Sequence, residues 1–280
     1  MTKHIRAAVA ALSMTLTGAG CVINIDGEGV VVRDEKRYSV AAGADVVLET
    51  FDGSVKVQSW ERPEVLVAIE KRGPDREMAA AIEVTATQTG DRIEVRAHEP
   101  KGRHDFVGLG NVQSASVSFV VSVPRAVKLT TQTGDGSITV ENIDGTINLR
   151  SGDGSIRATS LAGDVTARTE DGSIHLEGAM AALQATTGDG SVVIEALEGS
   201  VMKSDWEIAT GDGSIVFRVP GTFNADIDAS SRDGNVRGEL TGLEHERTDD
   251  DRETLKGRLG SGGHRVTLRS GDGSIRLVNR

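Results

Sequence analysis

The sequence has little of the residues that usually hold a compact exported domain together. Its 280 residues include 1 cysteine and 5 prolines, and aromatic side chains make up only 3%. One cysteine excludes an internal disulfide, and so few aromatic side chains do not suit a large mixed core. Glycine is abundant, with 34 residues. This balance favours many thin strands joined by tight turns, with Ile, Val, Leu and Ala inside.

The chain begins with a segment typical of export signals. Lys3 and Arg6 are followed by an uncharged stretch, Ala7 to Gly20. That stretch is shorter than the roughly 20 apolar residues of a membrane-spanning helix. We therefore expect residues 1–20 to be a signal peptide.

Small residues before Cys21 resemble the lipobox of bacterial lipoproteins, although Gly18 stands where that motif usually has Leu. The resemblance implies that Cys21 is lipidated and begins the mature chain, and that Val22 after it permits sorting to the outer membrane. Two acyl chains anchor a protein stably to a membrane. We expect an exported protein, lipid-anchored in the cell envelope at the outer membrane and facing the periplasm or the surface. An ordinary signal peptide cleaved near this point is the alternative.

Positive charge is also in short supply. The formal net charge is −11, and it becomes −13 once the two cations Lys3 and Arg6 are removed. Such an acidic protein is not suited to binding nucleic acid. Its expected partners are the membrane, through the lipid anchor, and an envelope protein or surface ligand.

One short motif recurs along the chain. Asp-Gly-Ser, or once Asp-Gly-Asn at Asp233, is preceded two residues earlier by Thr or Ser and followed by Ile or Val. The Asp-Gly-Ser turns are Asp52-Gly53, Asp135-Gly136, Asp153-Gly154, Asp171-Gly172, Asp189-Gly190, Asp212-Gly213 and Asp272-Gly273. The motif recurs every 18 residues from Asp135 to Asp189, and the last interval, 39 residues, is close to two periods plus an insertion.

Each period contains two short alternating segments. Ile138 and Val140 follow one turn, and Ile147 and Leu149 follow a weaker half-repeat, with polar residues between them. Alternation with a period of two indicates half-buried strands. A repeat of this length closes naturally as one coil of a stack. The sequence therefore predicts an all-β, single-chain β-solenoid with coils of about 18 residues and two strands each, preceded by a strand-rich N-terminal part.

The turn chemistry has two interpretations. In the first, Gly supplies a positive φ for a tight turn, and the Asp carboxylate accepts a backbone N–H two residues later, as in an Asx turn. Ser or Thr offers a further local hydrogen bond. The lesser alternative is calcium, with Asp135, Asp153, Asp171 and Asp189 as weak candidate ligands in one row. Calcium takes 6–8 oxygens, and the double glycine of calcium-binding nonapeptide repeats is missing. We therefore expect no cofactor, with Ca²⁺ as the secondary possibility.

The repeats divide the chain into regions. We expect a lipidated N-terminus and linker at 21–29, a β-rich part at 30–125, and the regular solenoid at 126–280 with a loop insertion at 244–263. Residues 75–82 are predicted to form a short helix, and a hairpin is predicted around Thr89-Gly90-Asp91. The acidic run Asp249 to Asp251 is predicted to be a solvated loop, with a cation site as the lesser interpretation.

Several of these motifs together resemble one bacterial family, DUF4097, whose members are described as candidate adhesins. The resemblance rests on Asp52 to Val57, on Trp60-Glu61-Arg62-Pro63, on Val123-Pro124-Arg125, and on the Thr-Gly-Asp-Gly-Ser-Ile coils up to the last one at Gly271 to Ile275. It covers most of residues 30–280. The resemblance implies a β-solenoid-like envelope protein and supplies no catalytic residues.

No enzymatic motif accompanies the repeats. The sequence has no P-loop, nucleophile elbow or dinucleotide fingerprint, and its histidines follow no metal-ligand spacing. We predict a protein that is not an enzyme and that presents an adhesin-like or protein-interaction surface on one flat face, with outward residues such as Thr139, Arg157, Thr166 and His175. The alternatives are an envelope structural or stress-sensing lipoprotein acting through a protein partner, and, as a lesser possibility, a calcium-stabilised or polysaccharide-active solenoid.

Overall fold

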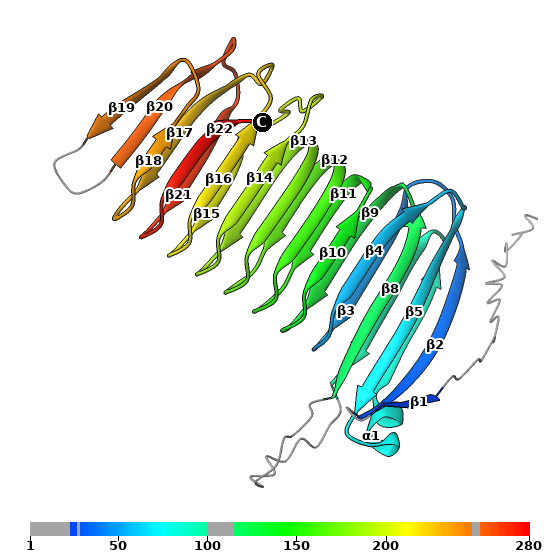
Figure 1. The fold of residues 1–280 in the computed structure, drawn as a ribbon. Helices are drawn as coiled ribbons and strands as arrows, with labels where there is room; N and C mark the ends of the chain where they lie inside the picture. Colours follow the sequence, from blue (N-terminus) through cyan, green and yellow to red (C-terminus); the bar gives the residue numbers. More distant parts are fainter. Residues whose placement is uncertain (1–22, 27–28, 100–114, 248–252) are drawn as a thin grey trace, which may run out of the picture.

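The protein is an elongated stack of β-strands. The computed structural model describes residues 23–26, 29–99, 115–247 and 253–280. In this part of the chain, 22 strands form one continuous sheet that folds into two layers. Figure 1 shows the strands lying side by side from β2, β5 and β8 at one end to β17, β19 and β20 at the other. The predicted all-β solenoid is confirmed.

The first layer contains the strands that follow the Asp-Gly-Ser and Asp-Gly-Asn turns, and four further strands that extend it at one end. Its spatial order is β1 (Ile23–Asp26), β2 (Gly29–Ser39), β5 (Glu64–Gly73), β8 (Ser116–Pro124), β4 (Val55–Trp60), β10 (Ile138–Glu141), the first halves of β12 (Ile156–Arg168) and β13 (Ile174–Thr187), β14 (Val192–Ala196), β16 (Ile215–Val219), β22 (Ile275–Asn279) and β18 (Val236–Gly238).

The second layer contains the strands that precede these turns. Its order is β6 (Glu83–Thr89), β7 (Arg92–His98), β3 (Ala44–Thr50), β9 (Ala126–Thr133), β11 (Asp144–Arg150), the second halves of β12 and β13, β15 (Trp206–Thr210), β21 (Arg265–Ser270), β17 (Ala225–Ser231), β20 (Glu253–Leu259) and β19 (Leu243–Arg247). The long strands β12 and β13 bend from one layer into the other.

Equivalent residues of successive coils stack in register. One inner row begins with Val55, Ile138, Ile156 and Ile174, each in register with the next along the stack. The row continues through β14, β16, β22 and β18. These side chains are at most 1% exposed, and each contributes roughly 1.5–3 kcal/mol through burial. The two layers close over one continuous apolar cluster. Because a single coil has no partner for its inner face, the array folds as a unit.

The stacking order departs from the chain order at both ends. The coil built from β21 and β22, with the turn at Asp272, lies between the coil at Asp212 and the coil at Asp233. The coil at Asp52 lies between the strands β7 and β8 on one side and the coil at Asp135 on the other. The interpretation of the last interval as two periods plus an insertion is therefore wrong, because the final coil returns between two earlier ones.

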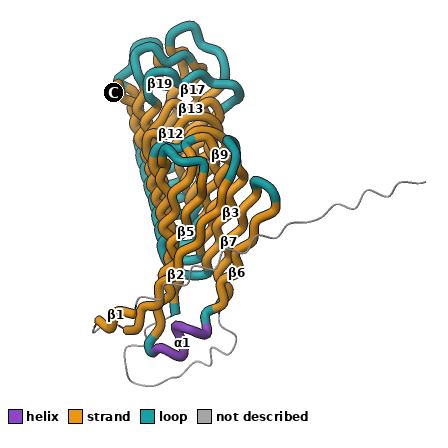
Figure 2. The backbone as a smooth tube through the Cα atoms, turned by 90° about the vertical axis from the view of Figure 1, so that its right-hand side faces the viewer, coloured by secondary structure: helices purple, strands orange, loops and turns teal. Residues whose placement is uncertain are grey.

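Antiparallel strands cover the ends of the parallel stack. β1, β2 and β5 extend one layer beyond β8, and β6 pairs with β7 in the other layer. The short helix α1 (Arg76–Ala81) begins after Asp75, whose carboxylate accepts the Met78 N–H at 2.8 Å. Figure 2 shows α1 and β1 together at the same end of these strands. The predicted helix and the hairpin at Gly90 are confirmed.

The predicted loop insertion at 244–263 is corrected in part. Residues 243–247 and 253–259 form β19 and β20, which extend the second layer antiparallel to β17. Leu255 is fully buried, so this hairpin closes the C-terminal end of the core. The acidic run from Asp249 to Asp251 lies outside the described residues. The described helix, α1, is not long or apolar enough to cross a membrane.

Candidate functional site

The recurrent turns form one corner of the solenoid, which we call the Asp-Gly-Ser corner. Its buried hydroxyls connect successive coils. Thr169 accepts a hydrogen bond from the Gly172 N–H of its own coil at 3.2 Å and donates to the Gly152 and Gly154 carbonyls of the preceding coil at 2.6 and 3.1 Å. The same donation to a glycine carbonyl of the neighbouring coil occurs at Thr133, Ser151, Thr187, Thr210, Ser270 and Ser231. Thr50 donates instead to the Val117 carbonyl of β8. The Thr or Ser of the motif is therefore the residue that ties the corners together.

The corner glycine is required by close packing. A Cβ at Gly154 would overlap the carbonyl oxygen of Gly136, and one at Gly172 would overlap that of Gly154. Among the glycines of the Asp-Gly-Ser and Asp-Gly-Asn turns, only Gly53 has a positive φ, at 119°. The expected reason, a left-handed turn, therefore applies to Gly53 alone. Elsewhere Gly is needed because the backbone of the preceding coil occupies the space of a side chain.

Four corner carboxylates do not make the expected Asx turn. Asp135, Asp153, Asp171 and Asp189 are exposed, and no hydrogen bond to their carboxylates is found within the described part of the chain, because the Thr or Ser hydroxyl caps the turn instead. Asp212, Asp233 and Asp272 are likewise exposed. Each coil thus places one carboxylate in a single outer row, where its short polar side chain is compatible with a turn.

The carboxylates of this row do not gather around a common point. Among the described residues, no group of three or more His, Cys, Asp or Glu side chains is placed to hold a metal ion. One carboxylate per coil falls short of the 6–8 oxygens that calcium takes. The weak candidates Asp135, Asp153, Asp171 and Asp189 thus lie in a row, one per coil, as the sequence predicts.

The outward residues lie on two faces, one on each layer. Thr139, Arg157 and His175 are neighbours in register on the first layer. Thr166 lies on the opposite layer, between Asn148 and Gln184. The expected single flat face is therefore wrong, because β12 bends from one layer into the other between Arg157 and Thr166.

His175 is half-buried among charged neighbours on the first layer. Its burial, followed by the charge of Arg157, lowers the pKa of the imidazole, and Glu195 and Glu177 partly oppose this. His175 is therefore biased towards the neutral form. His98 and His264 lie elsewhere on the surface, and His104 lies outside the described residues.

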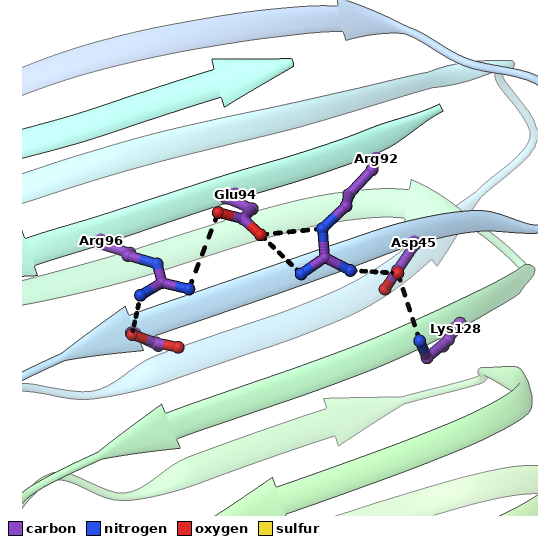
Figure 3. Close-up of polar contacts among 6 residues, drawn as sticks. Asp45, Arg92, Glu94, Arg96 and Lys128 are labelled. Carbon is purple, nitrogen blue, oxygen red and sulfur yellow. Dashed lines mark hydrogen bonds and ion pairs between the residues drawn. The ribbon is translucent and has the colours of Figure 1, made fainter. Parts of the chain in front are cut away.

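An ion-pair cluster crosses three strands of the second layer at the N-terminal end. Asp45 of β3 contacts both Arg92 of β7 and Lys128 of β9, the latter at 3.2 Å. Glu94 accepts from the Arg92 Nε at 2.8 Å, and Figure 3 shows these side chains pointing toward one another across the strands. Arg96 of β7 also pairs with Glu49 of β3 at 3.2 Å. The cluster ties the inserted strand β3 to its neighbours on both sides.

Sequence reasoning missed this cluster. Its signal is present in the alternation of Arg92, Glu94 and Arg96 and in the acidic Asp45 and Glu49. The pairing could not be inferred because nothing in the sequence places β3 beside β7. Cys21, the predicted lipidation site, lies outside the described residues.

The layered coils and their hydroxyl-linked corners define a β-solenoid built from a short turn repeat. The family model named Toastrack DUF4097 matches residues 39–278. The chain belongs to the DUF4097 family, as the sequence motifs predict. No curated protein matches the sequence.

Three solved structures are distantly similar to this chain. A candidate adhesin from Bacteroides fragilis has 13% identity and a TM-score of 0.44, covering 88% of this chain and 97% of its own. A candidate cell adhesion protein from Clostridium sporogenes has 11% identity and a TM-score of 0.37, covering 89% and 100%. A candidate lipid-binding protein from Parabacteroides distasonis has 10% identity and a TM-score of 0.37, covering 88% and 96%.

Proposed function

We propose that the protein is a non-enzymatic component of the bacterial cell envelope whose solenoid presents an interaction surface to a partner. The supporting observation is a contrast between repeated and unrepeated positions. The inner row beside the corner contains only Ile and Val, from Val55 to Val236. The outer row one residue further along mixes cationic, polar and apolar residues: Lys56, Thr139, Arg157, His175, Val193, Val216, Arg276 and Arg237.

This contrast distinguishes the residues that hold the coils together from the residues that face solvent. The core, the corner hydroxyls and the corner glycines are all engaged in stacking the coils. The outer rows do not form the apolar core or the corner bonds, and their residues vary along the stack. Repeat proteins use extended surfaces of this kind to bind partners. Specificity would then reside in the outer rows of one or both layers.

The corner carboxylates are poorly arranged for polysaccharide hydrolysis. Glycoside hydrolysis uses two carboxyl groups that flank the scissile bond. Here the aspartates form one exposed row on the outside of a turn. This arrangement supports a binding role rather than a hydrolytic one.

The envelope location rests on the segment around Cys21. With the anchor in place, the solenoid would be held at a membrane surface through its N-terminal end. Replacement of Cys21 by Ser is expected to release the full chain from membranes on fractionation. Persistent membrane association of this variant would contradict the anchor.

Charge reversals on the two layers test the proposed surface. Arg157 on the first layer and Arg150 on the second are both exposed, so Arg157→Glu and Arg150→Glu should leave the fold intact. With Cys21 replaced by Ser, the protein should bind an isolated envelope fraction saturably, and one of the two reversals should weaken that binding at least tenfold. Arg237→Glu, in the three-residue strand β18, is a control at the far end of the row.

Two results would contradict the proposal. One is binding that does not saturate, and the other is saturable binding that neither reversal changes. Unfolding midpoints equal to that of the parent would show that any loss of binding reflects the surface rather than the fold.

A further inference from the structure

We propose that residues 265–280, which we call the C-terminal coil, can be exchanged between two copies of the chain. The coil fills a slot between the coil formed by β15 and β16 and the coil formed by β17 and β18. In the monomer it fills its own slot. In an exchanged dimer it would fill the slot of a second copy.

The C-terminal coil is bound on both sides. β21 pairs in parallel with β15 and with β17, and β22 pairs in parallel with β16 and with β18. Its inward side chains, including Val266, Leu268 and Ile275, are at most 1% exposed. The module from β17 to β20 therefore joins the rest of the stack largely through this coil.

Only a segment that carries the corner motif fits this slot. Ser270 donates to the Gly213 carbonyl at 2.9 Å, and Ser231 donates to the Gly273 carbonyl at 2.7 Å. A Cβ at Gly273 would overlap the Gly213 carbonyl oxygen. A segment that fills the slot must therefore offer a hydroxyl and a glycine at this spacing. A second copy of the chain carries an identical segment.

The connector that leads into the coil can act as a hinge. It runs from β20 to β21 and contains Gly260, Gly262 and Gly263, with φ of 56°, 74° and 139°. Glycine adopts positive and negative φ about equally readily, so such a connector can change its direction. Exchange of an identical element through a hinge is the route of domain swapping.

The slot can also close when it is empty. Ile208 of β15 and Ala229 of β17 both pair with Leu268, and Thr210 and Ser231 both pair with Ser270. β15 and β17 are therefore in the same register, and Ser231 could take the place of Ser270 on the Gly213 carbonyl. A chain whose coil has left does not have to expose two open strand edges, so the state that leads to exchange is accessible.

Interchain disulfides test the proposal with full-length protein. Glu207 of β15 and Thr267 of β21 are outward neighbours in register. In-register neighbours lie about 4.8 Å apart, within the Cα separation of disulfides. Two variants are prepared, both with Cys21→Ser. One carries Glu207→Cys and the other carries Thr267→Cys. The two are unfolded, mixed, refolded together at high concentration and then oxidised.

A control pair lies in the regular middle of the array. Asn148→Cys and Thr166→Cys, on separate chains, are outward neighbours of β11 and β12. We expect covalent dimers from the pair at 207 and 267, in a yield that rises with protein concentration during refolding and exceeds the control yield at least tenfold. A chain with both Glu207→Cys and Thr267→Cys, refolded when dilute, forms the same bond internally and gives the reference yield. Absence of covalent dimer, or equal yields from both pairs, would overturn the proposal.

Discussion

The middle of the solenoid and its two ends are built on different plans. Between Asp135 and Asp212 each coil stacks on the one before it in the chain. At each end one coil is inserted out of order, and antiparallel strands follow beyond the parallel stack. Both inserted coils take part in the same kind of corner bond as the middle. Ser270 of one donates to the Gly213 carbonyl, and the Gly53 carbonyl of the other accepts from Thr133.

The ends also use contacts that the middle uses little. At the N-terminal end, Asp45 joins Arg92 and Lys128 across three strands. At the C-terminal end, Arg269 pairs with Asp228 of the neighbouring strand at 2.9 Å. The comparison shows that the repeat specifies how two coils fit together, whereas charges across the strands help to specify which coils meet.

The largest expected effect is a side chain at a corner glycine. Gly154→Ala would force a Cβ into the Gly136 carbonyl in the middle of the array, and we expect a loss of at least about 3 kcal/mol in the free energy of unfolding. Gly221→Ala, where no atom lies within 4 Å of the added Cβ, is the control. Chemical denaturation measures both.

The same glycine substitution in an inserted coil tests whether the C-terminal end unfolds separately from the middle of the stack. Gly273→Ala meets the Gly213 carbonyl, and we expect hydrogen exchange to accelerate in β17 to β22 while β10 to β14 stay protected. Uniform loss of protection along the whole stack would show that the ends and the middle unfold together.

A smaller loss of stability is expected from one buried threonine of the middle region, and none from another. Thr169→Val removes a hydroxyl that joins three backbone groups, and we expect a loss of about 2 kcal/mol. Thr131→Val removes a buried hydroxyl that has no hydrogen-bond partner, and we expect no loss, or a gain of up to about 1 kcal/mol. Equal destabilisation by both would contradict the role given to the corner hydroxyls.

A smaller effect is a pH dependence of stability that arises from His175 on the first layer. The pKa of His175 is lowered in the folded state, so below pH 6.5 the unfolded chain holds more protons there than the folded one. Stability should therefore fall as the pH drops through 6.5 and below. The difference in unfolding midpoint between pH 7.5 and pH 5 should shrink in His175→Gln and also in Arg157→Gln, which removes a charge that contributes to the shift. An unchanged difference in both variants would contradict the assignment.

The sequence was sufficient for the coil and insufficient for the stacking order. The alternation around Ile138 and Ile147 predicts the inward rows correctly. The position of β21 and β22 could not be predicted, because every coil presents the same backbone edge and the same Ile or Val. The chemistry of the corner was predicted in part: the local hydrogen bond of Thr or Ser is present, whereas the Asx turn expected of the aspartate is not found at Asp153 or Asp171. A carboxylate and a hydroxyl two residues apart can both cap a turn, and only the burial of the Thr or Ser side chain decides between them.

At the corner, the Thr or Ser hydroxyl holds neighbouring coils together and the Asp carboxylate does not. The repulsion between adjacent carboxylates is about 0.9 kcal/mol at most in water, and salt weakens it. The unfolding free energies of Thr169→Val and Asp171→Asn, each measured with calcium and with chelator, test this distinction directly. We expect Thr169→Val to be destabilised and Asp171→Asn to be as stable as the parent or slightly more stable, with no effect of calcium on either. A clear loss in Asp171→Asn, together with calcium stabilisation of the parent alone, would contradict the account and favour a cation site.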